Sequence, residues 1–247
     1  MLKRIVGGIL RSRAPYIFWA LRLSRMRRYF GEEELHVAPL LCDKQKPSVD
    51  IGAERGVYTA HILDKSHDCL AFEPRPTEAA ELKEMFGRLS LPVRVEAVAL
   101  SDTRGEARLR ILEQDGGRST IESDNTLEDP DGSGWFEITV PMRRLDDYAL
   151  EAVGFIKIDV EGYEHYAFKG AENLLRKDDA PGILFEFADW AENLASGLKA
   201  GDAQRILKDF GYDLFIFNVD QSITPINDIL TEGNFMLFAK KGHVQNG

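Results

Sequence analysis

The sequence predicts an α/β protein built on a doubly wound, mostly parallel sheet. Five short apolar runs have the length and composition of buried strands, and they occupy residues 48–52, 69–74, 93–100, 155–160 and 182–187. Amphipathic stretches alternate with these runs and predict helices over residues 57–64, 76–88, 163–176 and 203–210. Because strands separated by helices pair in parallel, the runs are expected to form one sheet with helices on both faces.

Two segments depart from this alternation. Residues 105–114 and 135–145 alternate apolar with polar side chains, like the arms of a hairpin, and a polar stretch from Asp115 to Gly134 joins them. That stretch is long for a loop in a compact domain, so it is either a lid or substrate loop or a disordered segment. Near the C-terminus, residues 212–218 and 234–240 predict two strands joined by a short loop at an antiparallel sheet edge.

The charge distribution divides the chain into two parts. Residues 1–31 contain eight Lys and Arg and no Asp or Glu, so the remaining residues carry 23 basic and 41 acidic side chains, a net charge of −18. We therefore expect a basic helical extension over residues 1–35 and one large α/β domain over residues 36–247. The acidic domain argues against nucleic acid as a partner, because phosphate binding needs a basic face.

The composition is that of an ordered globular protein. Hydrophobic residues make up 44% and charged residues 29% of the 247 positions. The two cysteines, Cys42 and Cys69, provide neither a metal cluster nor a disulfide framework, and both are expected to be buried hydrophobic residues. A cytoplasmic location is the default expectation.

The extension has the pattern of a basic amphipathic helix. Its longest uncharged run, residues 14–21, is far shorter than the roughly 20 apolar residues of a membrane crossing, and no signal-peptide pattern is present. One helical face carries Tyr16, Trp19, Leu23, Met26 and Phe30, and Arg25 and Arg28 lie opposite. The helix either packs on the domain, or makes peripheral contact with an anionic membrane through residues 1–30, or helps to hold a lipid-linked or glycan substrate.

The stretch VDIGAERGVYT, residues 49–59, ends the first predicted strand with a glycine turn. Gly52 permits a tight backbone turn against a ligand, and Gly56 opens the next helix without a side chain in the way. Glu73 ends the next strand, 21 positions after Gly52, where a carboxylate can accept both hydroxyls of an adenosine ribose. Together they predict a ligand that contains adenosine.

The charge of the turn distinguishes between adenosine ligands. A dinucleotide site needs the pattern G-x-G-x-x-G, whereas this turn contains Glu54 and Arg55. An acid would repel a pyrophosphate, but Asp50, Glu54 and Asp159 suit a ligand that carries an ammonium and a sulfonium group. S-Adenosylmethionine is therefore the expected cofactor, and NAD fits poorly.

Six blocks of the sequence resemble, in the same order, the FkbM-type S-adenosylmethionine-dependent methyltransferases. They are VDIGAERGVYT, AFEP, VALSDTRGEARL, RLDDY, FIKIDVEGYEHYAFKGAENLL and ILFEF, and they span about residues 48–187. The KIDVEGYE block is the most specific, while Glu54 departs from the Asn that the family usually has. The resemblance implies a class I methyltransferase, with a Rossmann-like seven-stranded sheet and an antiparallel C-terminal strand.

The resemblance also implies roles for the matching residues. The methionine half of the cofactor would lie against the turn residues Asp50, Gly52, Ala53 and Gly56, and its carboxylate against Tyr58 and Thr59, while Glu54 is a cofactor-binding candidate by its charge alone. Glu73 with Pro74 would hold the ribose, and Ser101 with Asp102 the edge of the adenine.

Methyl transfer to a hydroxyl needs an aligned acceptor and a base that removes its proton. Asp159 and Glu161 end the fourth predicted strand, and either could be that base or could hold a divalent ion that lowers the acceptor's pKa. Lys157 lies on the same strand face as Asp159 and could keep it ionised. The alternative is that both acids only shape the cofactor pocket. His165 is a rival base, because histidine titrates in a suitable range.

The resemblance implies an O-methyltransferase whose acceptor is a hydroxyl of a sugar or glycan, a lipid-linked sugar or a polyketide. Candidate substrate-binding residues are Arg118 and Ser119 in the polar stretch, Glu186 at the end of the fifth strand, and His165. Two alternatives stay open: a non-catalytic cofactor-binding or membrane-docked interaction protein, and an NAD-dependent oxidoreductase. The sequence does not specify the oligomeric state.

Overall fold

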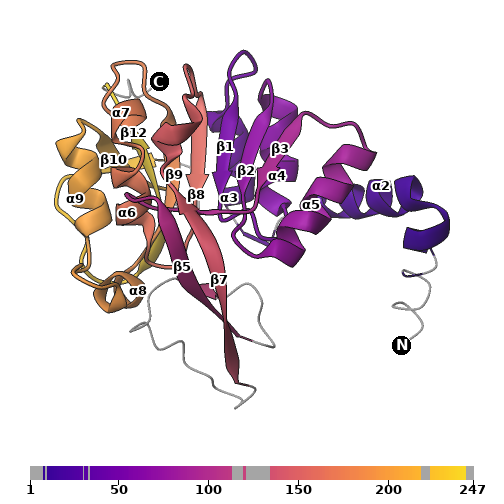
Figure 1. Cartoon of the computed structure of the whole chain (residues 1–247). Helices are drawn as coiled ribbons and strands as arrows, with labels where there is room; N and C mark the ends of the chain where they lie inside the picture. The colour runs from indigo at the N-terminus through magenta and orange to yellow at the C-terminus, as the bar shows by residue number, and fades with distance from the viewer. Residues whose placement is uncertain are drawn as a thin grey trace.

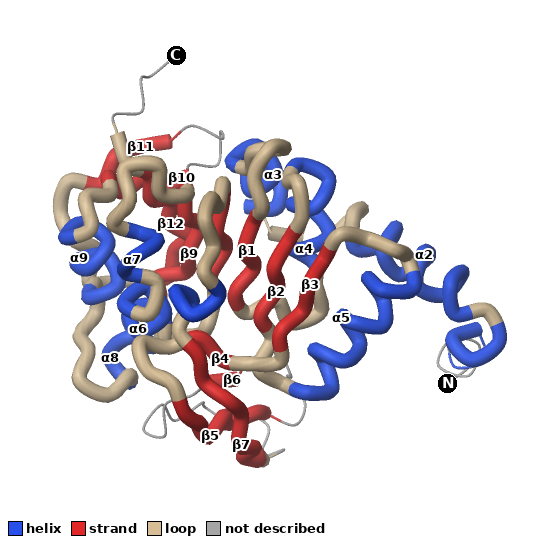
Figure 2. Tube along the Cα trace, turned by 45° about the horizontal axis from the view of Figure 1, so that its top comes forward, coloured by secondary structure: helices blue, strands red, loops and turns tan. Residues whose placement is uncertain are grey.

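The computed structural model describes residues 8, 10–29, 31–32, 34–112, 119–120, 134–217 and 223–242. Within these residues the largest sheet has eight strands in the order β11-β10-β12-β9-β8-β1-β2-β3 (Figure 2). The strands are β1 (Ser48–Ile51), β2 (Cys69–Phe72), β3 (Val93–Glu96), β8 (Phe155–Ile158), β9 (Gly182–Ala188), β10 (Asp213–Phe217), β11 (Ile223–Ile226) and β12 (Asn234–Lys240).

The sheet confirms the predicted α/β class. Strands β3, β2, β1, β8 and β9 are mutually parallel, and β12 is antiparallel to both β9 and β10. The prediction of a short loop between the last two strands was wrong. That segment contains β11, which pairs with β10 and adds an eighth strand. Pro225 lies within β11, a position that an edge strand tolerates and that hides the strand in the sequence.

Helices cover both faces of this sheet (Figure 1). One face packs against α2 (Pro15–Met26), α3 (Glu34–Leu41), α4 (Val57–Ile62) and α5 (Pro76–Arg88), and the other against α6 (Glu164–Lys169), α7 (Glu172–Leu175) and α9 (Asp202–Asp209). The short helix α8 (Asp189–Leu194) follows β9. Strand periodicity divides the core: Phe155 belongs to the cluster with Leu35 and Ile62, and its neighbour Ile156 to the cluster with Leu175.

Two predicted elements are divided. The helix expected over residues 163–176 is interrupted between α6 and α7, where a Cβ on Gly170 would lie 1.9 Å from the backbone oxygen of Ser101. The glycine thus permits close approach of another segment. The strand expected over residues 93–100 ends at Glu96, and its last two residues form β4 (Ala99–Leu100) in a second sheet.

The second sheet has the order β4-β7-β5-β6 and extends beyond one end of the main sheet (Figure 1). Strand β5 (Gly105–Leu112) pairs antiparallel with β7 (Trp135–Arg143), which confirms the predicted hairpin, and β6 (Ser119–Thr120) pairs with β5. Leu109, Ile111 and Val140 pack with Ala99 in a small apolar cluster. Apart from β6 and Gly134, the polar stretch between the hairpin arms lies outside the described residues.

Helix α2 packs on the domain, as the first interpretation of the extension expects. Trp19, Leu23 and Met26 are buried in one cluster with Leu82 and Phe86 of α5. Tryptophan buries a large apolar area, so this contact contributes on the order of 3 kcal/mol or more. The extension is therefore integrated into the core of the described structure.

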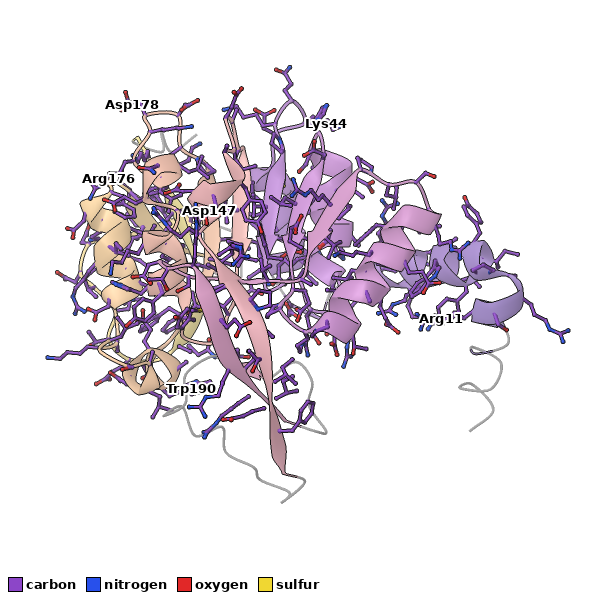
Figure 3. The ribbon with its side chains drawn as sticks, in the orientation of Figure 1. Arg11, Lys44, Asp147, Arg176, Asp178 and Trp190 are labelled. Atoms are coloured by element: carbon purple, nitrogen blue, oxygen red, sulfur yellow. The ribbon has the colours of Figure 1, made fainter. Side chains whose placement is uncertain are left out.

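Ion pairs reinforce this contact. Arg11 and Arg22 lie 2.7 and 2.8 Å from the carboxylate oxygens of Glu81 on α5, and Arg11 appears beside α5 in Figure 3. Tyr16 was expected on the buried face but is 62% exposed, because it lies at the margin of that face; Phe30 lies outside the described residues. No helix of the described segments has both the length and the apolar character of a bilayer crossing.

Candidate active site

A cavity of about 310 Å³ opens at the carboxyl ends of β1, β2 and β8. The turn after β1, the end of β2, residues 98–100, the end of β8 and Leu109 of the hairpin form its walls. In an open α/β sheet this edge is where ligands bind, and the volume lies at the lower end of the range for small-molecule sites. Nine of the predicted site residues line it: Gly52, Ala53, Glu54, Tyr58, Glu73, Pro74, Lys157, Asp159 and Glu161.

The turn between β1 and α4 uses left-handed backbone at three positions. Gly52, Glu54 and Gly56 have φ angles of 75°, 48° and 84°. A Cβ on Gly52 would lie 1.9 Å from the backbone oxygen of Asp159, so the glycine allows the turn to pack on the end of β8. A Cβ on Gly56 would lie 2.7 Å from the Leu82 side chain, so this glycine serves the contact between α4 and α5 rather than the cavity.

Beneath this turn lies a buried group of charges. Asp50 is fully buried, and its Oδ2 accepts a hydrogen bond of 2.5 Å from Thr59 Oγ1. Lys157 Nζ lies 3.8 Å from Asp50 Oδ1 and 3.5 Å from Asp159 Oδ2, and it donates a hydrogen bond of 3.1 Å to the Gly52 oxygen. Asp50 and Thr59, predicted to contact the cofactor, therefore support the turn from below and do not line the cavity.

Burial and charge compete for the pKa values in this group. Desolvation raises the pKa of Asp50, and Lys157 and Thr59 only partly oppose that effect. Desolvation lowers the pKa of Lys157, but the attraction of Asp159 and Asp50 outweighs it, so the net pKa is raised. At neutral pH the lysine is therefore a buried cation between two carboxyl groups.

Glu73 is held in one orientation at the end of β2. Its Oε1 accepts hydrogen bonds of 2.9 and 2.8 Å from the backbone nitrogen and Nε of Arg75, and its Oε2 accepts one of 2.8 Å from the Glu54 nitrogen. The Glu73 and Arg75 side chains are only 3% and 4% exposed. A carboxylate has about four acceptor sites, so at least one on Oε2 stays available for a ribose hydroxyl.

Three carboxylates converge at the ends of β8 and β9. Asp159, Glu161 and Glu186 each place an oxygen within 4.8 Å of the other two. Glu161 has a φ of 54° and precedes Gly162 with a φ of 95°, so a left-handed turn directs this part of the chain. Burial, and next the charges of Asp159 and Glu161, raise the pKa of Glu186 to about 8. The cluster thus holds a proton at neutral pH that the other two acids stabilise.

The structure does not bring every predicted residue to the cavity. Ser101 Oγ lies 3.2 Å from the Tyr163 hydroxyl, and Asp102 forms an ion pair of 2.9 Å with Lys169, because the chain leaves the main sheet before β4. His165 places Nδ1 3.2 Å from the Asp202 carbonyl oxygen, on the side of α6 that faces α9. Arg118 lies outside the described residues, and of Ser119 only the backbone, in β6, is described.

Three features of the cavity escaped the sequence analysis. Arg75 lines the ribose end, and Glu32 from the extension lines the outer wall. Burial, and next the charge of Glu32, raise the pKa of Tyr58, whose ring lies 4.7 Å from Lys157 Nζ. Val98 and Leu100 supply the apolar wall that was assigned to Ser101 and Asp102. Of these residues, only Arg75 could have been found in the sequence, because it is a charged residue between Glu73 and Pro76, the first residue of α5.

The residues present fit S-adenosylmethionine. Phe72, Val98 and Leu100 form an apolar wall near Glu73, which suits an adenine next to a ribose. The opposite end carries Asp159 and Glu161, which suit an ammonium and a sulfonium. Asp50 Oδ1 is buried without a hydrogen-bond partner, but it lies 3.8 Å from Lys157 Nζ beneath the turn, so its charge is met by the lysine and not by the cavity.

The strand order, the glycine turn and the acid at the end of β2 define a class I methyltransferase fold. The chain belongs to the FkbM methyltransferase family, since residues 50–214 match the Methyltransferase FkbM domain. It is 29% identical over 153 residues to the 31-O-demethyl-FK506 methyltransferase FkbM of Streptomyces tacrolimicus, a match that covers 50% of this chain and 58% of that protein. The crystal structure of methyltransferase FkbM from Methylobacillus flagellatus KT aligns with a TM-score of 0.51 and 13% identity, covering 95% of this chain and 60% of that one. This chain therefore spans less than two thirds of either relative.

Proposed function

We propose that the protein is an S-adenosylmethionine-dependent O-methyltransferase. The observation that carries the proposal is Glu73, a buried carboxylate fixed at the end of β2 and joined by a hydrogen bond to the glycine turn after β1. This pairing of an acid with a glycine turn is how such sheets recognise adenosine. The acids at the other end of the cavity distinguish a cationic cofactor from a dinucleotide.

The chain's own residues would align the acceptor and remove its proton. S-Adenosylmethionine, when bound, supplies the electrophilic methyl group. Asp159 or Glu161 would accept the proton of the acceptor hydroxyl, since both line the cavity beside the Gly52 turn. Lys157, 3.5 Å from Asp159, would hold that carboxylate in place by charge attraction. Glu186 would bind the acceptor from the adjacent strand end.

A divalent ion is an alternative means of activating the acceptor. Asp159, Glu161 and Glu186 offer three oxygens within 4.8 Å of one another, and hard cations prefer oxygen ligands. Turnover after dialysis against EDTA, with and without added Mg²⁺, separates the two routes. Loss and recovery would favour the ion, and unchanged turnover would leave a carboxylate as the base.

We further propose a hydroxyl acceptor on a sugar, a lipid-linked sugar or a polyketide. The Streptomyces tacrolimicus relative is named for methylation of an oxygen of FK506, which supports transfer to oxygen. The basic extension makes a glycan or a lipid-linked sugar the first acceptor class to test. Incorporation of labelled methyl groups into a panel of glycans and polyketides identifies the class.

Calorimetry tests the cofactor. S-Adenosylmethionine and S-adenosylhomocysteine are expected to bind in the micromolar range and NADH not at all, whereas the reverse pattern would establish an oxidoreductase. Glu73→Ala should abolish cofactor binding. Asp159→Asn should retain a bound cofactor with little turnover, and full turnover in this variant would exclude Asp159 as the base. Cofactor binding with no turnover on any acceptor would favour a non-catalytic binding protein.

A further inference from the structure

We propose that the outer face of α2 docks on an anionic lipid bilayer. This outer face consists of Ile17, Leu21 and Arg25, opposite the buried residues of the same helix, and is extended by Tyr16 at its margin and by Arg28 in the turn after Met26. The inference concerns a different surface from the cavity and does not depend on methyl transfer.

The outer face is unusually apolar for a surface helix. Tyr16, Ile17 and Leu21 are 62%, 53% and 55% exposed. Seven large hydrophobic side chains are exposed within the described residues, and five of them lie between positions 16 and 40. These five are Tyr16, Ile17 and Leu21 on α2, together with Tyr29 and Leu40. Exposed apolar residues are normal when scattered singly, but a group on one element marks an interaction surface.

Arginines interleave with these apolar residues. Ile17, Leu21 and Arg25 follow one another at spacings of four, so they share one side of the helix, and Arg28 lies in the turn that follows Met26. Among the described residues Arg25 forms no ion pair, and the Arg28 guanidinium bonds only within the helix, to the Ser24 oxygen and hydroxyl. By contrast, Arg11 and Arg22 are neutralised by glutamates of α5. The charge left on the outer side is therefore positive.

A groove beside the outer face adds a place for a lipid. It has a volume of about 340 Å³ and lies between α2 and the residues after α5. Leu23, Leu89 and Leu91 supply apolar lining, and the basic lining residues are Arg28 and Arg27, the latter paired with Asp64. A lining that combines apolar and basic residues matches the boundary between acyl chains and phosphate headgroups.

The charge of the whole chain favours a lipid surface over another occupant. Residues 1–31 contain no acid, while the rest of the chain has a net charge of −18. An anionic membrane would attract the extension and repel the body, so the molecule would dock with α2 toward the surface. Figures 1 and 2 show α2 at one end of the molecule. The 12-residue helix, about 18 Å long, suits an in-plane orientation.

Sedimentation with vesicles tests the proposal. The full chain should sediment with vesicles of phosphatidylcholine mixed with phosphatidylglycerol, should bind phosphatidylcholine alone at least tenfold more weakly, and should be released by high salt. Ile17→Glu/Leu21→Glu should reduce binding more than tenfold, and Arg25→Glu about fivefold or more, since one basic residue contributes about 1 kcal/mol at such a surface.

Matched variants control for charge and for exposed hydrophobicity. Arg108→Glu changes the net charge as Arg25→Glu does, but on β5, and Trp190→Glu removes an exposed aromatic residue at the other end of the molecule (Figure 3). Both should bind vesicles like the wild type, and melting temperatures should show that all variants fold.

Three results would overturn the proposal. They are absence of binding to anionic vesicles, equal loss of binding in the control variants, and a dimer in light scattering that Ile17→Glu/Leu21→Glu dissociates while vesicle binding is absent. The last result would assign the face to a second copy of the chain. Because none of these readouts uses a cofactor, they leave the proposed methyl transfer untouched.

Discussion

Replacing Lys157 by Met removes a buried cation beneath the glycine turn. The lysine is 2% exposed and lies between the fully buried Asp50 and Asp159. Met keeps the length and apolar character of the lysine stem, so the substitution mainly deletes the charge. Asp50 is then left ionised in a site from which water is excluded.

The magnitude follows from the options left to Asp50. Breaking a buried pair by removing one partner costs about 3–5 kcal/mol. If Asp50 takes up a proton instead, holding a carboxyl of ordinary pKa neutral at pH 7 costs about 4 kcal/mol, at roughly 1.4 kcal/mol per pH unit. We therefore expect Lys157→Met to lower the free energy of unfolding by about 3–4 kcal/mol at pH 7.

Denaturant unfolding of a double-mutant cycle measures this cost. Lys157→Met/Asp50→Asn should recover most of the lost stability, giving a coupling energy of at least about 2 kcal/mol, because no charge is then left unpaired. In the single variant the folded-state pKa of Asp50 exceeds its unfolded value, so stability should increase as pH falls from 7 toward 5. In the wild type the pKa of Lys157 is raised, so its contribution is complete below the unfolded value and is lost only in strongly alkaline solution.

A small effect would refute this reasoning. If Lys157→Met changed stability by less than about 1 kcal/mol at pH 7, with no dependence on pH between 5 and 7, the lysine would not be compensating Asp50. If the double variant were as unstable as the sum of the two single variants, the two residues would act independently.

Three further predictions test other parts of the site. Glu186→Gln should abolish a rise of kcat/KM toward pH 8, because the pKa of Glu186 is about 8 and a cationic cofactor favours its ionised form; an unchanged pH profile contradicts this. Arg75→Ala should weaken cofactor binding about tenfold with kcat nearly unchanged, since it releases Glu73 Oε1, and Arg75→Lys should restore part of the loss. Gly52→Ala should destabilise the fold by more than about 3 kcal/mol in denaturant unfolding, because of the 1.9 Å contact and the positive φ; Gly87→Ala in α5, which meets open space, should be neutral or stabilising.

The sequence predicts this fold where the physics is local. Short apolar runs locate the main strands, and helical patterns locate the helices between them. The alternating arms around the polar stretch locate the β5–β7 hairpin. The strand pattern over residues 93–100 gave no sign that the chain leaves the sheet after Glu96, because that departure is set by pairing with β7. Likewise the break at Gly170 depends on the approach of Ser101, a contact between distant segments.

The same distinction holds for the site. Residues placed at strand ends, such as Glu73 and Asp159, reach the cavity because parallel strands bring their carboxyl ends to one edge. Asp50 ends inside the sheet's layer, because strand alternation directs its side chain toward Thr59 of α4. Glu32 could not be predicted, since its place at the cavity depends on how the extension packs.

The pairing of charges explains why the cavity would favour a cation. Five carboxyl-bearing residues line it, namely Glu32, Glu54, Glu73, Asp159 and Glu161, against two basic residues, Lys157 and Arg75. Both basic residues are already engaged, Arg75 with Glu73 and Lys157 with Asp50 and Asp159. Acidic residues therefore outnumber basic residues in the lining, and desolvation strengthens the attraction of such a lining for a positive ligand. The same acids would repel a pyrophosphate. The absence of a dinucleotide pattern from the turn therefore agrees with the acidic lining of the cavity.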